Sequence, residues 1–352
     1  MNPATAELQE DQVIVTKPKD VGRLFNKSRF GTPLSKNQLR LDVIEACFLV
    51  EEKKLVVYSK GKKLTWEDLV TIAASNKETF EKRYLIFTDL RRRGHQLKLL
   101  PKDPSFTFYT KNQQEQTKPP SLIATFSERE QCTINRLVSL INHANQQKNN
   151  CWLSIADEEG DITYYELDSQ PLEGTVKPQS FKKTKGILLQ DRVLIFNQSI
   201  VDTLHQQEFF GKRFGKGLQI SLVEAFYLIK KNMLNLHSTT GKKISEKSFE
   251  KHVKQIQPDI AKRYPVYCDL KKQGLIVKTG FKFGNHFRAY TDHPDQTHAE
   301  YLIHAIPSDE ILGWAEISRA IRLAHSVNKT FLFASIDEKE NIMYLSFKRI
   351  RP

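Results

Sequence analysis

The sequence predicts an α+β protein built by tandem duplication. A chain of 352 residues with 39% hydrophobic residues is long enough for more than one buried core. Its second half repeats the first at a shift of about 180 positions. Helical patterns stand beside short β-rich segments in each half. Each repeat is therefore expected to consist of a small α/β N-terminal subdomain and a C-terminal subdomain with a mixed sheet.

The register of the duplication holds over most of the chain. At a shift of 180 the matching positions include Asp11 with Asp191, Phe30 with Phe210, Arg83 with Arg263, Asp89 with Asp269, Gly94 with Gly274 and Asp157 with Asp337. Two segments slip by one residue, as small loop insertions would produce: Ala46 falls on Ala225, and Tyr109 falls on Tyr290. The period is too long for a solenoid, so each repeat is a domain-sized unit.

The domain boundaries follow from the register and from the composition between the repeats. We expect an N-terminal repeat over residues 1–175, a linker over residues 176–186 and a C-terminal repeat over residues 187–352. The seam carries Pro171, Gly174 and Pro178 and a run of lysines, which is typical of a linker.

The elements are predicted from periodicity and from helix-ending signals. Helices are expected over residues 41–50 and 218–229, and again over residues 78–93 and 258–273, where Gly94 and Gly274 end them. The last part of the chain reads as a strand over 301–306, a helix over 311–326, and two strands over 330–336 and 342–347. Ile317, Ile321 and Ala324 fall on one face of that helix, which should pack on the sheet.

Composition points to a polyanionic partner. The formal net charge is +13 and the isoelectric point is about 9.4, as is usual for proteins that neutralise phosphates. General solubility is the simpler explanation of this charge. The N-terminal residues do not resemble a signal peptide, and no segment is apolar enough to span a membrane. The four cysteines show no CxxC spacing, so a reducing cytoplasm is expected.

Three segments of the second repeat carry candidate chemistry. An aromatic stretch with a glycine runs from Phe281 to Tyr290, a histidine at position 298 precedes an apolar strand, and Lys329 precedes the next one. This order resembles the signature of the archaeal tRNA-intron (splicing) endonucleases, in which a tyrosine, a histidine and a lysine form the catalytic triad. The similarity is clearest over about residues 263–344, so residues 263–352 are expected to form a nuclease-like catalytic subdomain.

The residue types suit cleavage of RNA through its own 2′-hydroxyl. That reaction needs a base, an acid for the departing 5′-oxygen, and a cation for the charge that develops on phosphorus. The resemblance implies that Tyr290 is the base, His298 the acid and Lys329 the electrostatic stabiliser, with no metal or cofactor. It also implies products with 2′,3′-cyclic phosphate and 5′-hydroxyl ends. Of the other histidines, His286, His293 and His325 are expected at the surface, and His304 is expected to be packed or paired.

The first repeat is expected to be catalytically inactive. Tyr109 matches Tyr290, but Lys118 stands where the second repeat has His298, and Asn149 stands where it has Lys329. This pattern resembles the family's homodimeric class, in which one chain fuses a structural unit to a catalytic unit. A homodimer acting on precursor tRNA is therefore implied.

The resemblance also suggests surfaces for assembly and for RNA. The acidic loop of Asp157, Glu158, Glu159 and Asp161 is implied to dock into a basic pocket of a partner chain, although a solvated turn is the simpler interpretation. Arginines near the triad are the candidates for RNA binding, and Arg322 matches a position that stacks on a flipped base in the family. The other candidates are Arg288 and Arg319, with Lys348, Arg349 or Tyr344 as a second stacking residue.

Other functions remain open on the sequence. The chain could be a non-catalytic RNA-binding subunit of a splicing endonuclease assembly, although one complete triad argues against it. A metal-dependent nuclease would use Asp269 or the Asp337-Glu338 pair. Neither a GxGxxG nor a GxxxxGK[ST] motif follows a strand. The range of substrates, from the symmetric bulge-helix-bulge of precursor tRNA to ribosomal RNA introns, is not fixed by the sequence.

Overall fold

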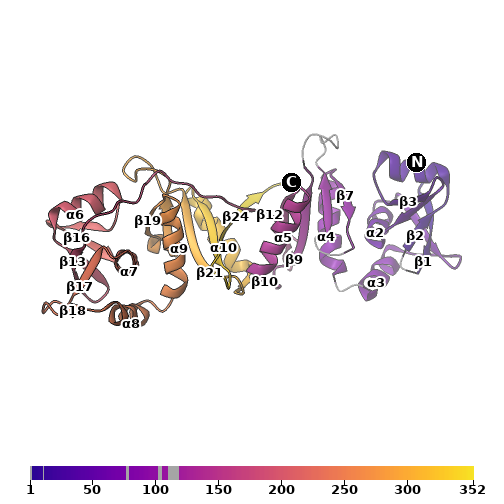
Figure 1. Cartoon of the computed structure of the whole chain (residues 1–352). Coiled ribbons are helices and arrows are strands. Elements are labelled where there is room, and N and C mark those ends of the chain that lie inside the picture. Colours follow the sequence, from indigo (N-terminus) through magenta and orange to yellow (C-terminus); the bar gives the residue numbers. More distant parts are fainter. Residues whose placement is uncertain (1, 11, 77–78, 102–104, 110–118) are drawn as a thin grey trace. The chain divides into compact units, whose positions relative to one another are not determined.

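The computed structural model of the chain describes residues 2–10, 12–76, 79–101, 105–109 and 119–352. It divides into two compact units, one of residues 1–131, 137–167 and 349–352, and one of residues 132–136 and 168–348 (Figure 1). Each unit begins with a six-stranded sheet and continues with strands of a second mixed sheet. The predicted duplication and α+β class are confirmed.

The first unit opens with an α/β subdomain. Its sheet has the order β3-β4-β2-β1-β5-β6, in which β1 and β5 are parallel and the other neighbours are antiparallel. Its elements are β1 (Ala4–Gln9), β2 (Gln12–Val15), α1 (Pro18–Val21), β3 (Thr32–Ser35), β4 (Gln38–Leu41), α2 (Val43–Glu51), β5 (Leu55–Ser59), β6 (Lys62–Lys63) and α3 (Trp66–Asn76). A π-helical turn, Gly22–Lys27, follows α1.

The C-terminal subdomain of the first unit contains a mixed sheet. Its strands follow the order β7-β8-β9-β11-β12, and only β9 and β11 are parallel. The elements are α4 (Phe80–Arg92), β7 (Gln96–Leu99), β8 (Phe106–Tyr109), β9 (Ser121–Ser127), β10 (Gln131–Thr133), α5 (Ile134–Gln146), β11 (Asn150–Ala156) and β12 (Ile162–Ser169).

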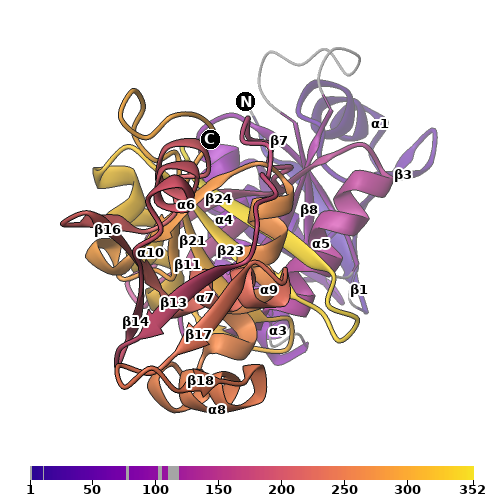
Figure 2. The same cartoon turned by 60° about the vertical axis from the view of Figure 1, so that its left-hand side comes forward.

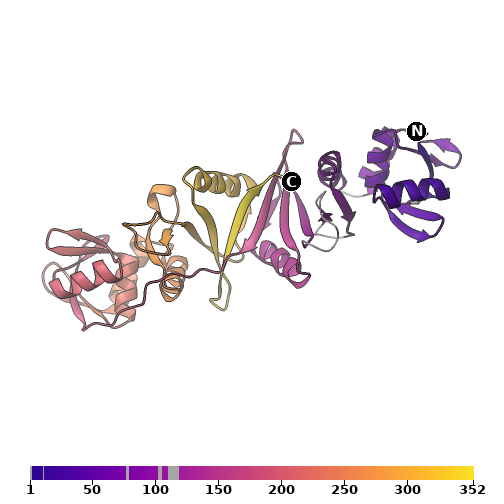
Figure 3. The same ribbon diagram turned by 90° about the horizontal axis from the view of Figure 1, so that it is seen from above.

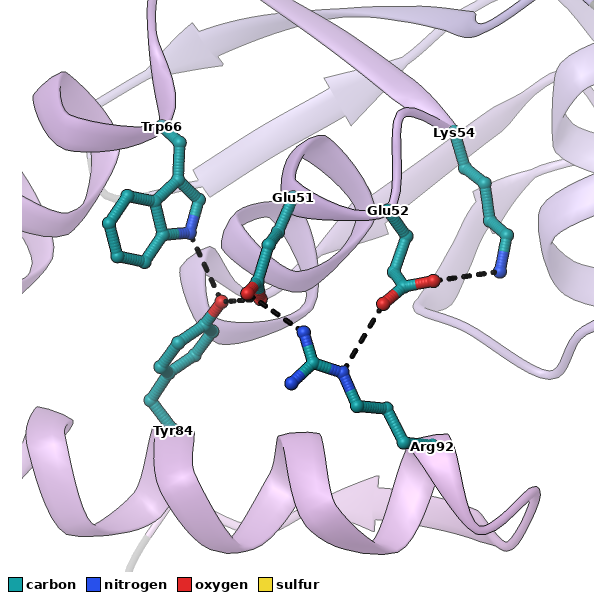
Figure 4. A network of polar contacts seen from close by, with 6 residues as sticks. All are labelled: Glu51, Glu52, Lys54, Trp66, Tyr84 and Arg92. Atoms are coloured by element: carbon teal, nitrogen blue, oxygen red, sulfur yellow. Dashed lines mark hydrogen bonds and ion pairs between the residues drawn. The ribbon is translucent and has the colours of Figure 1, made fainter. Parts of the chain in front are cut away.

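The two subdomains of the first unit are joined by polar contacts between α2, α3 and α4 (Figure 4). The Tyr84 hydroxyl donates to Glu51 over 2.6 Å and accepts from the Trp66 indole over 3.1 Å. Arg92 donates to Glu51 over 2.8 Å and to Glu52 over 3.3 Å. Acids at the end of α2 are therefore matched by a cation on α4.

The second unit repeats this order of elements. Its first sheet follows β15-β16-β14-β13-β17-β18, and α7 packs against β14, β16 and β17 (Figure 2). The elements of this subdomain are β13 (Thr184–Leu188), β14 (Arg192–Ile195), α6 (Gln198–Asp202), a π-helical turn (Thr203–Gln207), β15 (Lys212–Phe214), β16 (Gly217–Ser221), α7 (Leu222–Lys230), β17 (Leu234–His237), β18 (Lys243–Ile244) and α8 (Glu246–Ile256).

The predicted helix over 218–229 begins later than expected. Leu218 and Ile220 are buried on alternate positions and belong to β16, which ends at Ser221. There Ser221 and Glu224 form a capping box, and Glu224 also accepts the backbone N–H of Gly211 over 2.8 Å. The first unit has the same arrangement, made by Asp42, Glu45 and Gly31.

The C-terminal subdomain of the second unit carries the sheet that positions the candidate site. The strand order is β19-β20-β21-β23-β24, with β21 and β23 parallel. The elements are α9 (Ile260–Lys272), β19 (Ile276–Thr279), a 3-10 turn (Phe281–Phe283), β20 (Phe287–Tyr290), β21 (Tyr301–Pro307), β22 (Ile311–Gly313), α10 (Trp314–Ser326), β23 (Thr330–Ile336) and β24 (Ile342–Ile350). The predicted strands are confirmed, and the predicted helix over 311–326 begins only at Trp314 because β22 precedes it.

Helices α9 and α10 cover the two faces of this sheet (Figure 3). Ile303 and Leu332 belong to the core that includes Val266 and Leu270 of α9. Side chains alternate along a strand, so their neighbours face α10, which contacts β23. The predicted apolar stripe of α10 is buried, with Ile317 fully enclosed.

No helix within the described ranges is both long and apolar enough to cross a membrane.

Candidate active site

The three residues predicted as a triad lie at one edge of the sheet in the second unit. Tyr290 is the last residue of β20, His298 lies three positions before β21, and Lys329 directly precedes β23. Strand β20 runs antiparallel to β21, and β21 runs parallel to β23. The end of β20 and the beginnings of β21 and β23 therefore meet at the same edge.

Tyr290 is held by apolar neighbours. Its side chain is 8% exposed and packs in a small cluster with Ile276 and Ala299. The backbone of Tyr290 pairs with Ile276 across β19 and β20. The guanidinium of Arg288 lies 5.8 Å from the centre of the Tyr290 ring. The Tyr290 ring is therefore held in place, with the Arg288 cation over it.

Ala299 connects the three candidate residues. The Lys329 ammonium donates to the Ala299 carbonyl over 2.7 Å, and it lies 5.9 Å from the ring centre of Phe283. Ala299 packs on Tyr290 on one side and follows His298 on the other. The His298 side chain is exposed. The arrangement places a phenol, an imidazole and an ammonium around a single residue, with the imidazole open to solvent.

The candidate RNA-binding arginines have different environments. Arg319 and Arg322 are exposed on α10, on the face opposite to its buried stripe. Arg322 donates weakly to the Ser318 carbonyl of its own helix over 3.4 Å. Arg288 is half-buried, and its Nε has no hydrogen-bond partner among the described residues. Two of the three arginines are thus free to meet a ligand at the surface.

The hypothesis that Tyr344 stacks on a base is wrong. Tyr344 is 5% exposed, and its hydroxyl donates to Asp269 over 2.7 Å. The first unit has the same contact between Tyr164 and Asp89, also at 2.7 Å. Because both repeats keep this pair, its role is to join α9 or α4 to the sheet. Asp269 also accepts from Gln273, so it is engaged in the fold.

The acidic loop follows β11 in the first unit, and its members differ in availability. Asp157 organises the turn by accepting the backbone N–H groups of Glu159 and Asp161 over 3.0 and 2.8 Å. Glu158 forms an ion pair with Arg129. Glu159 and Asp161 are exposed, and no ion pair joins them to another residue of the described ranges. The loop thus presents two carboxylates to solvent.

The first unit has the same framework without the same chemistry. Phe106 pairs with Ile123 in β8 and β9, as Phe287 pairs with Ile303 in β20 and β21. Tyr109 therefore ends its strand as Tyr290 does. Asn149 precedes β11 where Lys329 precedes β23, and Lys118 lies outside the described residues.

A buried ion pair that the sequence did not reveal joins α9 to the residue after the π-helical turn of the second unit. Lys271 and Glu208 approach to 3.5 Å with side chains 2% and 3% exposed. Burial lowers the pKa of Lys271, and the Glu208 carboxylate acts in the opposite direction. In the first unit Arg91 donates instead to the Ser28 carbonyl over 2.7 Å. Of these two matched cations, only Lys271 of the second unit therefore has a buried carboxylate as its ion-pair partner among the described residues.

A stacked pair of histidines, one buried and one half-buried, lies beside the N-terminus of α9. The rings of His286 and His304 stack with centres 4.1 Å apart. His286 accepts the Ala305 N–H at Nδ1 over 2.9 Å, so its Nε2 carries the proton toward Asp259, 3.2 Å away. His286 is only 8% exposed, so its predicted surface position is wrong, whereas the packing expected for His304 is confirmed by its ring contacts with His286 and Phe333.

We expect this pair to make the free energy of unfolding depend on pH. Burial is the main cause that lowers the pKa of both histidines, to about 4 for His304. Because the histidine pKa is lower in the folded state, the unfolded chain binds protons at a higher pH than the folded chain does. The free energy of unfolding is therefore at its full value above the unfolded pKa of about 6.5 and decreases as the pH falls below that value. We expect the free energy of unfolding to drop by about 2 kcal/mol per histidine between pH 7 and pH 5.

Urea unfolding at pH 7, 6 and 5 measures this dependence. The control replaces the pair by the residues of the first repeat, Ser105 and Ala124, as His286→Ser with His304→Ala. The variant should lose most of the difference between pH 7 and pH 5. An unchanged pH dependence in the variant would assign the effect to other groups.

Comparison with known families agrees with the duplicated architecture. The family described as "tRNA intron endonuclease, catalytic C-terminal domain" matches residues 80–164 and 260–344. The family described as "tRNA intron endonuclease, N-terminal domain" matches residues 4–70 and 184–250. The second catalytic match contains Tyr290, His298 and Lys329.

Full-length relatives carry one name. A tRNA-splicing endonuclease of Methanococcoides burtonii is 33% identical over 353 residues, which cover 98% of this chain and 99% of that protein. Another, of Methanosarcina mazei, is 30% identical over the whole of both chains. One of Haloferax volcanii is 28% identical over 96% of this chain and 98% of its own length. The chain therefore belongs to the tRNA intron endonuclease family, as an endonuclease in which the N-terminal and the catalytic domain each occur twice.

Proposed function

We propose that the second repeat cleaves precursor tRNA at both splice sites, and that the first repeat is structural. The observation that carries this proposal is the meeting of Tyr290, His298 and Lys329 at one sheet edge, linked through Ala299. The first repeat keeps the fold and the tyrosine but has Asn149 in place of Lys329. The names of the full-length relatives support precursor tRNA as the substrate.

The chemistry follows from the three side chains. Tyr290 removes the proton of the 2′-hydroxyl, whose oxygen attacks the adjacent phosphorus. The bond from phosphorus to the 5′-oxygen breaks, and His298 gives that oxygen its proton. The Lys329 ammonium stabilises the negative charge on the phosphorane. The products are a 2′,3′-cyclic phosphate and a 5′-hydroxyl. In this step Tyr290 starts as the phenolate and His298 as the imidazolium, and exchange of one proton each with solvent restores both.

Recognition of a bulge-helix-bulge RNA is assigned to the arginines beside this edge. Arg322 is exposed on α10, which ends at Ser326 shortly before Lys329, and its guanidinium would stack on a base flipped toward the triad. Arg319 lies one turn further back and is placed to meet phosphates. Arg288 lies over the ring of Tyr290, the proposed general base.

The working form is proposed to be a homodimer in which the acidic loop of one chain docks on the second unit of its partner. A cavity of about 1140 Å³ in the second unit is lined by Lys230, Lys231 and Lys272. These lysines stand where the first unit has Glu51, Glu52 and Arg92, the acids and cation of Figure 4.

The exchange of charge puts three lysines in the wall of the cavity, which also carries Glu208, Asp269 and Glu340. In the first unit Arg92 pairs with both glutamates, and Lys54 pairs with Glu52 as well. In the second unit Lys230 pairs with Glu246, and Lys231 and Lys272 are exposed. Two exposed lysines match in number the two exposed carboxylates, Glu159 and Asp161.

Cleavage of a bulge-helix-bulge RNA in EDTA, with end-group analysis of the products, tests the proposed activity. Cyclic phosphate and 5′-hydroxyl ends formed without divalent metal are expected. RNA that is bound without being cut would favour a non-catalytic RNA-binding subunit. Cleavage that stops in EDTA would favour a metal-dependent nuclease.

A further inference from the structure

The segment that joins the two repeats is bound along its length to the second unit. We call residues 170–179 the strap; β13 begins only at Thr184. Backbone N–H groups of the strap donate to carbonyls of the second unit at four places. These bonds run from Gln170 to Tyr344 (2.8 Å), Gly174 to Gln273 (2.8 Å), Thr175 to Thr291 (3.1 Å) and Val176 to Gly274 (2.9 Å). Part of the segment expected to be a linker is therefore docked structure.

Two side-chain contacts fix the ends of the strap. Leu172 is 7% exposed and belongs to the main core of the second unit. The backbone N–H of Gln179 donates over 2.9 Å to Glu208, the carboxylate of the buried pair with Lys271. A buried carboxylate with two partners holds its position well. The strap is thus anchored on both sides of Gly174.

The strap crosses the end of α9 where only glycines fit. A Cβ on Gly174 would lie 2.2 Å from the Gly274 carbonyl oxygen. Gly274 follows the C-cap of α9 with φ of +79°, and a Cβ there would lie 2.6 Å from the Gly174 carbonyl oxygen. The two backbones are in direct contact, so a side chain at position 174 must push the strap away.

The middle of the strap contacts the residue after the candidate catalytic tyrosine and the cluster around that tyrosine. Both the N–H and the hydroxyl of Thr175 donate to the carbonyl of Thr291, over 3.1 and 3.2 Å. Thr291 directly follows Tyr290. The Val176 side chain packs against the cluster of Tyr290 and Ala299. The strap therefore holds the chain directly after Tyr290 and packs against the cluster that contains the Tyr290 ring.

We propose that the strap is a positioning element of the active site, and that Thr175 and Val176 hold Tyr290 in place for proton removal. The inference rests on the proposed function of Tyr290. A small displacement of a catalytic group slows reaction strongly without altering substrate binding to the same degree. Loss of strap contacts should therefore lower the rate of the bound complex and leave substrate affinity nearly unchanged.

Single-turnover cleavage at saturating RNA tests the strap. Thr175→Val removes only the hydroxyl and should slow the reaction about 3- to 10-fold, as loss of one neutral hydrogen bond implies. Thr175→Ser keeps the hydroxyl and should retain the wild-type rate. Gly174→Ala should slow the reaction on the order of 10²-fold by displacing the strap. The control is Gly313→Ala, where a Cβ meets nothing within 4 Å.

Hydrogen exchange of the peptide covering residues 170–180 gives a readout that does not depend on activity. In Gly174→Ala the amides of the strap should exchange faster than in the wild type, while the RNA dissociation constant changes less than the rate. If Thr175→Val and Gly174→Ala both cleave at the wild-type rate while Tyr290→Phe is inactive, the strap is only a tether. That result would overturn the role of the strap and leave the proposed function of Tyr290 standing. A wild type that does not cleave would overturn the proposed function as well.

Discussion

Replacing His298 by alanine is expected to slow cleavage of a bulge-helix-bulge RNA by about 10²–10⁴-fold, the usual contribution of a general acid. The side chain is exposed, so its removal leaves no cavity in the core. Stability should change little, because substitutions at exposed positions seldom matter for folding. Single-turnover rates with thermal unfolding of the same sample measure both effects.

The control for this prediction is His325→Ala. His325 is also exposed, on the last turn of α10. It belongs to the same subdomain but not to the three strand ends that form the site. Full activity of His298→Ala would remove the imidazole from the mechanism. Equal losses in the two variants would point to a general effect of charge on RNA binding.

Reversing the two free charges of the acidic loop, as Glu159→Lys with Asp161→Lys, is expected to convert the proposed homodimer to monomers. Like charges would then face Lys231 and Lys272 across the interface, which costs several kcal/mol. A change of about 4 kcal/mol weakens a dissociation constant about 10³-fold. Sedimentation velocity at micromolar concentration detects this change, and cleavage should be lost with the dimer.

Two further variants decide whether the pairing is specific. Adding Lys231→Glu and Lys272→Glu to the reversed loop should restore the dimer. Glu338→Lys with Asp309→Lys makes the same change of net charge at exposed positions of the second unit and should leave the dimer intact. A dimer that survives reversal of the loop would contradict this docking.

The sequence predicted the duplicated fold because the repeat register is long. Matched pairs such as Asp89 and Asp269 recur in the structure as the same contact, from Tyr164 and from Tyr344. Element starts were less well predicted. Leu218 and Ile220 suit either a helix or a strand, and the capping box of Ser221 decides where α7 begins. The strand that precedes the cap depends on the pairing of β16 with β14, which is a tertiary contact.

The candidate site was predicted in part. The order of Tyr290, His298 and Lys329 was visible in the sequence. The role of Ala299 was not, because its backbone carbonyl accepts the hydrogen bond from Lys329 and any residue type has such a carbonyl. The burial of His286 was also hidden. Its imidazole is satisfied by the Ala305 N–H and lies against Asp259, and both contacts come from segments distant in the chain. The docking of the strap depends on backbone contacts that composition does not report.

The central claim is that the active site belongs to the second repeat, and the two matched tyrosines test it most directly. Tyr290→Phe and Tyr109→Phe remove the same hydroxyl at equivalent strand ends. Single-turnover cleavage in EDTA should fall by about 10²-fold or more for Tyr290→Phe and stay at the wild-type rate for Tyr109→Phe. Equal rates for the two variants, or a loss confined to Tyr109→Phe, would contradict the account.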